Sequence, residues 1–123
     1  MNSMVDETAL RRLHGIGGDR LLVGMLDLFL TNLPVRVGRI RTGLANRDVA
    51  EVRQAAHSLK STAGNLGAAT LSSVSAQIER HADEGDLAAV QDLAEHLAEC
   101  ADATSAVLHA YRAQHCATES CTN

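Results

Sequence analysis

Apolar residues recur along this chain at spacings of three and four, the period of an α-helix that buries one face. A short amphipathic helix is predicted over residues 6–13, closed by the glycines of residues 15–18, with Asp19 as the N-cap of the next helix. Pro34 lies within that next helix and predicts a kink, because it removes one backbone donor. The stripe of this long helix is Leu22, Leu26, Phe29, Leu33, Val37, Ile40 and Leu44.

A second long stripe begins after a turn at residues 46–47. Asp48 and Glu51 have the spacing of an N-terminal capping pair, and Gly64 and Gly67 are predicted to end the helix. Its buried positions are Val49, Val52, Ala56, Leu59, Ala63 and Leu66.

Two more helices follow. Thr70 is the predicted N-cap of the third, and Gly85-Asp86 ends it and begins the fourth. The third helix would bury Leu71, Val74 and Ile78. The fourth would bury Leu87, Val90, Ala94, Leu97, Ala101, Thr104 and Leu108.

Four long stripes joined by short connections predict an all-α fold, an antiparallel up-down four-helix bundle with a short extra N-terminal helix. The composition agrees, because 46% of residues are hydrophobic but only 2% are aromatic, so Leu, Val, Ile and Ala must form the core. We expect one domain over residues 1–113 and a disordered tail over residues 114–123, where the periodicity is lost.

Charge and cysteine content exclude several classes of function. The net charge is −4, and there is neither a basic run nor an aromatic platform, so nucleic-acid binding is not expected. Cys100, Cys116 and Cys121 lack CxxC spacing, which favours reduced thiols and a cytoplasmic protein. The apolar run over residues 21–30 is broken by Asp27 and is shorter than the roughly 20 residues of a membrane span.

The candidate chemistry lies at His57 and Lys60, the only lysine in the chain. Residues three apart are neighbours on a helix, and phasing at 100° per residue puts His57 roughly 130° from the centre of the buried stripe. We therefore expect an accessible imidazole beside one ammonium, with the small residues Ser61 and Gly64 leaving room for a partner. A neutral imidazole is a nucleophile, and a lysine supplies a mobile point charge for a phosphoryl group. On spacing alone, an ordinary exposed histidine and a solvated lysine are an equal alternative.

The segment over residues 56–68, AHSLKSTAGNLGA, resembles the signature of histidine-containing phosphotransfer (HPt) domains. In that signature the phosphorylated histidine is followed by Lys at +3, usually Gly at +4, and Gly at +10. Here these positions hold His57, Lys60, Ser61 and Gly67. The resemblance extends over residues 6–112 and implies a four-helix bundle with an exposed phospho-accepting histidine.

The resemblance also implies roles for the surrounding residues. Lys60 would counter phosphoryl charge, and Gly64 and Gly67 would permit close approach of a partner. Ser61 departs from the usual glycine, and its hydroxyl would either bond back to the His57 carbonyl or touch the phosphoryl group. The family often places a polar residue of the next helix near the histidine; by spacing, this is Glu79 or Gln77.

The function implied is that of a phosphorelay intermediate, in which His57 takes a phosphoryl group from one receiver-domain aspartate and passes it to another. The partners would be response-regulator receiver domains or a hybrid sensor histidine kinase. No cofactor is expected in this domain, and Mg²⁺ would come from the receiver. The glycines over residues 15–18 are followed by no lysine of a phosphate-binding loop, so the chain would be a carrier without kinase activity of its own.

Two alternatives remain. The bundle could be a docking module that binds or sequesters a partner without carrying phosphate. Leu21, Met25 and Leu28 form a second apolar line, which would either pack on the N-terminal helix or extend a docking patch near His57. A weaker alternative is a metal shared by His96 and Cys100, but no second pair with ligand spacing exists, so we predict no metal ligands. His14, His81, His109 and His115 are interpreted as surface residues.

Overall fold

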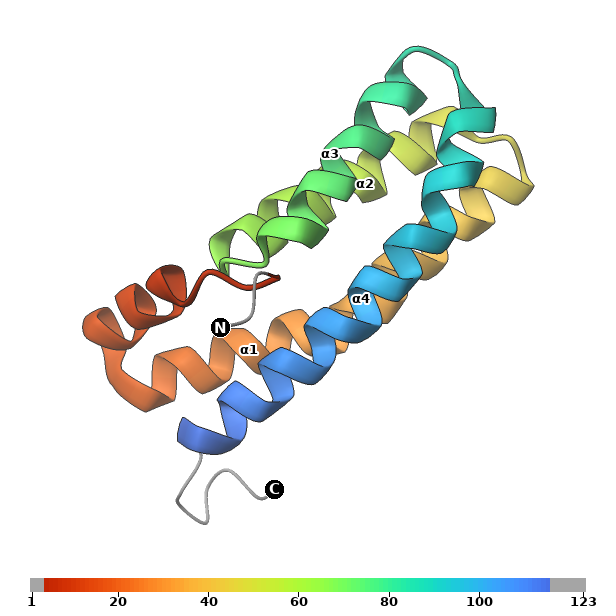
Figure 1. Cartoon of the computed structure of the whole chain (residues 1–123). Coiled ribbons are helices and arrows are strands. Elements are labelled where there is room, and N and C mark those ends of the chain that lie inside the picture. Colours follow the sequence, from red (N-terminus) through yellow and green to blue (C-terminus); the bar gives the residue numbers. More distant parts are fainter. Residues whose placement is uncertain (1–3, 116–123) are drawn as a thin grey trace.

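Four helices form the protein, whose computed structural model describes residues 4–115. They are α1 (Glu7–Ala45), α2 (Val49–Asn65), α3 (Ala69–Asp83) and α4 (Leu87–His115). Each helix packs on the next, and α4 returns to α1, so the helices alternate in direction around one core (Figure 1). The predicted all-α bundle is confirmed.

A break at Gly18 divides α1 into a short N-terminal segment and a long helix. Gly18 has φ 68° and ψ −161°, while the backbone stays helical through Pro34. The break is therefore at the glycine, and it produces the short extra helix that the sequence predicts. The Asp6 side chain caps its start by accepting from the Thr8 amide at 3.0 Å. Asp19, the predicted cap of the second part, instead contacts the side chains of His14 and His115.

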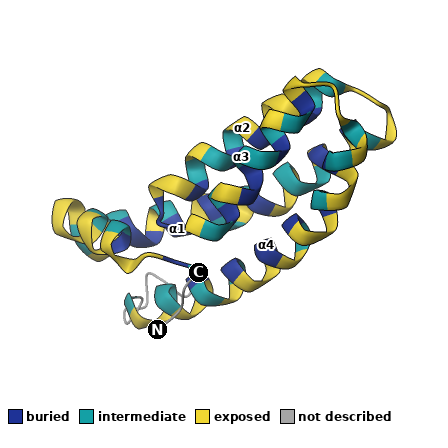
Figure 2. Cartoon of the chain, turned by 45° about the horizontal axis from the view of Figure 1, so that its top comes forward, coloured by how far each residue is buried: buried dark blue, intermediate teal, exposed yellow. Residues whose placement is uncertain are grey.

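The predicted stripes form the core. Buried residues lie on the inward faces of all four helices, and exposed residues lie on the outer faces (Figure 2). Val37, Leu44, Val49 and Leu87 are only partly buried. The largest side chains that are fully enclosed include Leu10, Leu22, Leu26, Leu33, Ile40, Leu59, Leu71, Ile78, Leu97 and Leu108.

The helix boundaries follow local chemistry with one exception. The Asp48 side chain accepts from the Glu51 amide at 3.1 Å, and Asp86 accepts from the Ala89 amide at 3.1 Å after Gly85 at φ 77°. The predicted cap Thr70 is wrong, because α3 begins at Ala69 and its N-cap is Ala68, which makes no side-chain capping bond. The positive φ of Gly67 turns the chain earlier, so the N-cap lies two residues before the predicted Thr70.

Gly67 joins the end of α2 to the N-terminal segment. Its carbonyl accepts a 2.6 Å hydrogen bond from the Asp6 amide, and its own φ is 74°. A Cβ at this position would lie 2.2 Å from the Asp6 carbonyl oxygen. A side chain at this position would therefore meet both a left-handed backbone and a backbone clash.

Helix α4 continues to His115, two residues beyond the predicted domain boundary, and the rest of the predicted tail lies outside the described residues.

By length and composition alone, α1 qualifies as a candidate membrane span, with 33% of the relevant window buried in the bundle. Leu22, Leu26 and Phe29 of this helix are core side chains, which accounts for its apolar character.

Candidate functional site

His57 projects from α2 on the side away from its buried residues. Ala55 and Ala56 are fully buried beside it, while the His57 side chain is 60% exposed, as helix phasing predicts. Its Nδ1 atom lies 2.6 Å from Oε2 of Glu79 on α3. A neutral imidazole that donates from Nδ1 keeps a lone pair on Nε2. The contact therefore fixes the orientation of the ring and leaves Nε2 available.

Glu79 connects the histidine to the lysine. Its second oxygen, Oε1, accepts a 2.7 Å hydrogen bond from Nζ of Lys60. Partial burial raises the pKa of the Glu79 carboxyl, but hydrogen bonds from Lys60 and His57 outweigh it, so the pKa lies below its ordinary 4.5. The carboxylate is thus ionised at neutral pH, with one oxygen on each partner.

Small residues surround this group on the Lys60 side. Gly64 is exposed, and a Cβ there would meet only the Ser72 hydroxyl oxygen at 3.5 Å, an ordinary contact. The Ser72 hydroxyl itself donates to the Lys60 carbonyl at 2.9 Å. A cavity of about 520 Å³ opens here, lined by Lys60, Gly64 and Ser72 together with Arg12 of the N-terminal segment. The surface next to the lysine is therefore open and carries a second cation.

The remaining predicted site residues fall in different places. Glu79 rather than Gln77 meets the imidazole, and Gln77 is half-buried on α3. Gly67 is buried, so the close approach that it permits is made by the chain's own Asp6. Within residues 4–115 the exposed Ser61 hydroxyl makes no hydrogen bond, so the predicted bond to the His57 carbonyl is not formed.

The residues of the second apolar line of α1 take both predicted roles: one packs on the N-terminal segment, and the others extend an apolar surface. Leu21 packs on the N-terminal segment, since a Cβ on Gly17 would lie 2.6 Å from Cβ of Leu21. Leu28 is 60% exposed and, with Met25, lines a small cavity of about 90 Å³ that reaches Thr62 of α2. An apolar surface thus continues from α1 onto the helix that bears His57.

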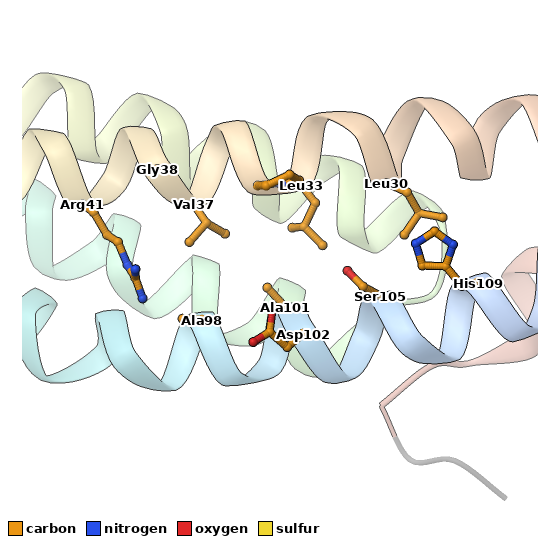
Figure 3. Close-up of a pocket in the computed structure, with 11 residues that line it drawn as sticks. Leu30, Leu33, Val37, Gly38, Arg41, Ala98, Ala101, Asp102, Ser105 and His109 are labelled. Atoms are coloured by element: carbon orange, nitrogen blue, oxygen red, sulfur yellow. The ribbon is translucent and has the colours of Figure 1, made fainter.

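A separate groove lies between α1 and α4, away from His57. It encloses about 510 Å³, with His109 at one end, Arg41 at the other, and apolar side chains such as Leu33 and Val37 between them (Figure 3). All of its lining residues belong to α1 and α4, whereas the histidine, lysine and carboxylate belong to α2 and α3. The groove therefore takes no part in the chemistry of His57.

His96 and Cys100, the alternative metal pair, lie together on α4. The Cys100 Sγ atom is 3.7 Å from Nε2 of His96, and no third ligand joins them among the described residues. Burial, followed by the charge of Glu99, raises the pKa of the Cys100 thiol above 9.0, which disfavours the thiolate that a metal requires.

One cluster of potential ligands has no signal in the sequence. His14, Asp19 and His115 bring three potential ligand atoms within 4.8 Å of one another. Residues five apart on a continuous helix point about 140° away from each other, so the spacing of His14 and Asp19 gives no signal. The break at Gly18 and the far end of α4 create the cluster, and neither is readable as a contact in the sequence.

The chain is therefore a four-helix bundle that presents an accessible histidine on α2. The Hpt domain family matches residues 24–107, and the chain belongs to this family. Its fold is similar to the crystal structure of histidine-containing phosphotransfer protein B (HptB) from Pseudomonas aeruginosa PAO1, at 23% identity and a TM-score of 0.88. That alignment covers 93% of this chain and 98% of HptB. No match was found among curated proteins.

Family membership gives the general function. HPt domains act in phosphorelays as phosphoryl carriers rather than kinases, and they work with response-regulator receivers.

Proposed function

We propose that His57 accepts a phosphoryl group from the aspartyl phosphate of one receiver domain and passes it to an aspartate of a second, in the cytoplasm. The observation that supports this most directly is the exposed imidazole held at Nδ1 by Glu79, with Lys60 on the same carboxylate. The group comprises a nucleophile, an orienting acceptor and a cation.

The transfer step forms one bond and breaks one. The lone pair on Nε2 attacks phosphorus, and the electron pair of the phosphorus–oxygen bond leaves with the receiver carboxylate. The proton on Nδ1 stays on the ring, which becomes a phospho-imidazolium. The ionised Glu79 carboxylate, 2.6 Å away, stabilises that positive charge. Attack on Nε2-bound phosphorus by the second aspartate reverses the step.

Lys60 is proposed to carry part of the phosphoryl charge. Its ammonium has three donors and gives one to Glu79, so the other two are available to phosphoryl oxygens. The carboxylate also keeps Lys60 near the ring before the phosphoryl group arrives. Catalysis of this transfer depends mainly on positioning and charge neutralisation. Mg²⁺, which would neutralise further phosphoryl charge, is expected from the receiver.

Receiver docking is proposed on the surface that Leu28 and Met25 begin. Leu28 is exposed, and the cavity beside it reaches α2 at Thr62. The Arg36 Nε donates to the Ser58 hydroxyl at 2.9 Å, which links α1 to the residue directly after His57. A partner seated on these side chains would cover apolar area that extends from α1 onto the helix that bears His57.

Phosphotransfer from a labelled receiver tests the proposal. The chain is incubated with a phosphorylated receiver and Mg²⁺, and acid-labile, base-stable label is measured. We expect label on the wild type, no label on His57→Gln, and normal label on His109→Gln, a matched exposed histidine on α4.

The outcomes separate the two candidate functions. Label that survives His57→Gln would overturn the assignment of the phosphoacceptor. Tight binding of receivers without label on His57 would favour the docking module that carries no phosphate.

A further inference from the structure

A group of three side chains at the end of the bundle opposite the α1–α2 and α3–α4 loops carries a second inference. His14 lies in the N-terminal segment of α1, Asp19 follows the break, and His115 is the last residue of α4. Nε2 of His14 is 2.9 Å from Oδ1 of Asp19, and Nδ1 of His115 is 3.0 Å from the same oxygen. Two imidazole nitrogens and one carboxylate oxygen therefore converge on one point.

The backbone explains why these residues meet. Gly18 leaves the helical region with φ 68° and ψ −161°, and this reverses the divergence that residues 14 and 19 would have on a continuous helix. His115 is held by its neighbour, because its ring lies 4.8 Å from the Tyr111 ring at an interplanar angle of 30°. The rings of His14 and His115 are 5.1 Å apart. The arrangement thus depends on the backbone at Gly18 and on the tilted ring contact with Tyr111.

We propose that His14, Asp19 and His115 form a binding site for a divalent transition-metal ion of the Zn²⁺ class. Imidazole nitrogen with a single carboxylate oxygen suits Zn²⁺, Ni²⁺ or Cu²⁺, whereas Mg²⁺ and Ca²⁺ prefer oxygen ligands alone. Three protein ligands leave the remaining coordination position to water.

The distances agree with such a site after a small adjustment. Ligand atoms about 2.0–2.1 Å from a tetrahedral Zn²⁺ lie about 3.3 Å from each other. The two nitrogen–oxygen separations of 2.9 and 3.0 Å need to open slightly, and all three atoms already lie within 4.8 Å. Each imidazole would keep one proton by moving it to its other nitrogen. The required movement is within side-chain rotation.

The site would act as a clamp between two parts of the chain. His14 and Asp19 flank the break in α1, and His115 ends α4, so a bound ion joins the first helical segment to the last turn. Metal binding that needs the folded arrangement stabilises the fold. The consequence is a bundle whose two terminal segments are held together more strongly when zinc is present.

Zn²⁺ titration of the full chain by calorimetry tests the site. Cys116→Ser and Cys121→Ser are combined as the background, so that thiols near the end of the chain do not compete. We expect one Zn²⁺ per chain and at least about 10-fold weaker binding in His14→Gln, Asp19→Asn or His115→Gln. Asp19→Asn is the sharpest variant, because it retains an acceptor for imidazole N–H groups while losing the ligand charge.

Matched controls distinguish this site from the other histidines. His109→Gln and His96→Gln should bind Zn²⁺ like the background protein. A rise in melting temperature with Zn²⁺ in the background but not in Asp19→Asn would give the same answer from stability. No binding, equal binding in all three ligand variants, or loss of binding in His96→Gln would each overturn the proposal and leave a hydrogen-bonded cluster. None of these results bears on phosphotransfer by His57.

Discussion

Oε2 of Glu79 lies 2.6 Å from Nδ1 of His57, and this single contact joins α3 to the reactive side chain of α2. Because Nδ1 is engaged in this hydrogen bond, Nε2 is the ring nitrogen that remains available for attack on phosphorus. Removing it should affect reactivity without exposing the imidazole further, because the side chain is already 60% exposed.

Glu79→Ala should slow phosphotransfer to His57 by about 10–100-fold. The reason is that hydrogen bonds to charged groups contribute about 1.5–3 kcal/mol. Glu79→Gln retains an acceptor without the charge and should fall between the wild type and the alanine variant. Single-turnover transfer from a labelled receiver measures the rates. Equal rates in all three proteins would contradict the orienting role.

Lys60→Gln should lower the transfer rate by about 10-fold, because one charge-assisted contact to the phosphoryl group is lost at a half-exposed position. Lys60→Arg retains the charge but presents a planar group, so it should recover only part of the rate. The same single-turnover assay applies. A rate for Lys60→Arg no better than for Lys60→Gln would argue against a role for charge.

Acid should remove the stabilisation that Glu79 provides. The pKa of Glu79 is lowered from 4.5 in the folded protein, so its contribution is present above the unfolded value and lost as pH falls below about 4.5. Urea unfolding of the wild type and Glu79→Gln between pH 7 and pH 3 measures this. We expect the difference in unfolding free energy to shrink with acidification; a constant difference would contradict the linkage.

Gly67→Ala and Gly64→Ala should behave differently, although both lie near the end of α2. Gly67→Ala adds a Cβ to a left-handed residue against the Asp6 carbonyl, so it should lose more than about 1–2 kcal/mol of stability. Gly64→Ala adds a Cβ that makes only an ordinary 3.5 Å contact with the Ser72 hydroxyl, so it should fold normally and serve as a probe of partner approach. Denaturant unfolding separates the two; equal stability would contradict the packing at Gly67.

Leu28→Ala should weaken receiver binding with little change in stability, because Leu28 is exposed and its removal creates no cavity. Its neighbour Phe29 is buried, and Phe29→Ala should instead lose about 3–5 kcal/mol. Calorimetric binding to a receiver and thermal unfolding measure the two effects. Undiminished affinity in Leu28→Ala would place the docking surface elsewhere.

Periodicity is the reason that much of the fold was predictable. Buried stripes such as Val52, Ala56 and Leu59 mark one helix face without ambiguity, and the Asp48 cap is a local signal. Thr70 is not the N-cap because the turn before α3 is set by the left-handed Gly67, whose packing against Asp6 is a contact across 61 residues. Local patterns do not carry such contacts.

The site residues show the same difference between local patterns and contacts across the fold. The His57–Lys60 relationship lies within one helix turn, so phasing predicts it. The choice of Glu79 over Gln77 depends on how α3 rotates against α2, which the sequence leaves open. The cluster of His14, Asp19 and His115 required both the Gly18 break and the register of α4, so no residue spacing indicates it.

The bond between Asp6 and Gly67 bears on how this protein should be handled. Because Asp6 also lines the cavity that contains Lys60 and Arg12, anything attached upstream of it starts beside the proposed phosphoryl site. A bulky affinity tag at that end would compete with receivers for the same space. Tagging after α4 is no simple remedy, because His115 at the end of that helix lies beside His14 of the same N-terminal segment.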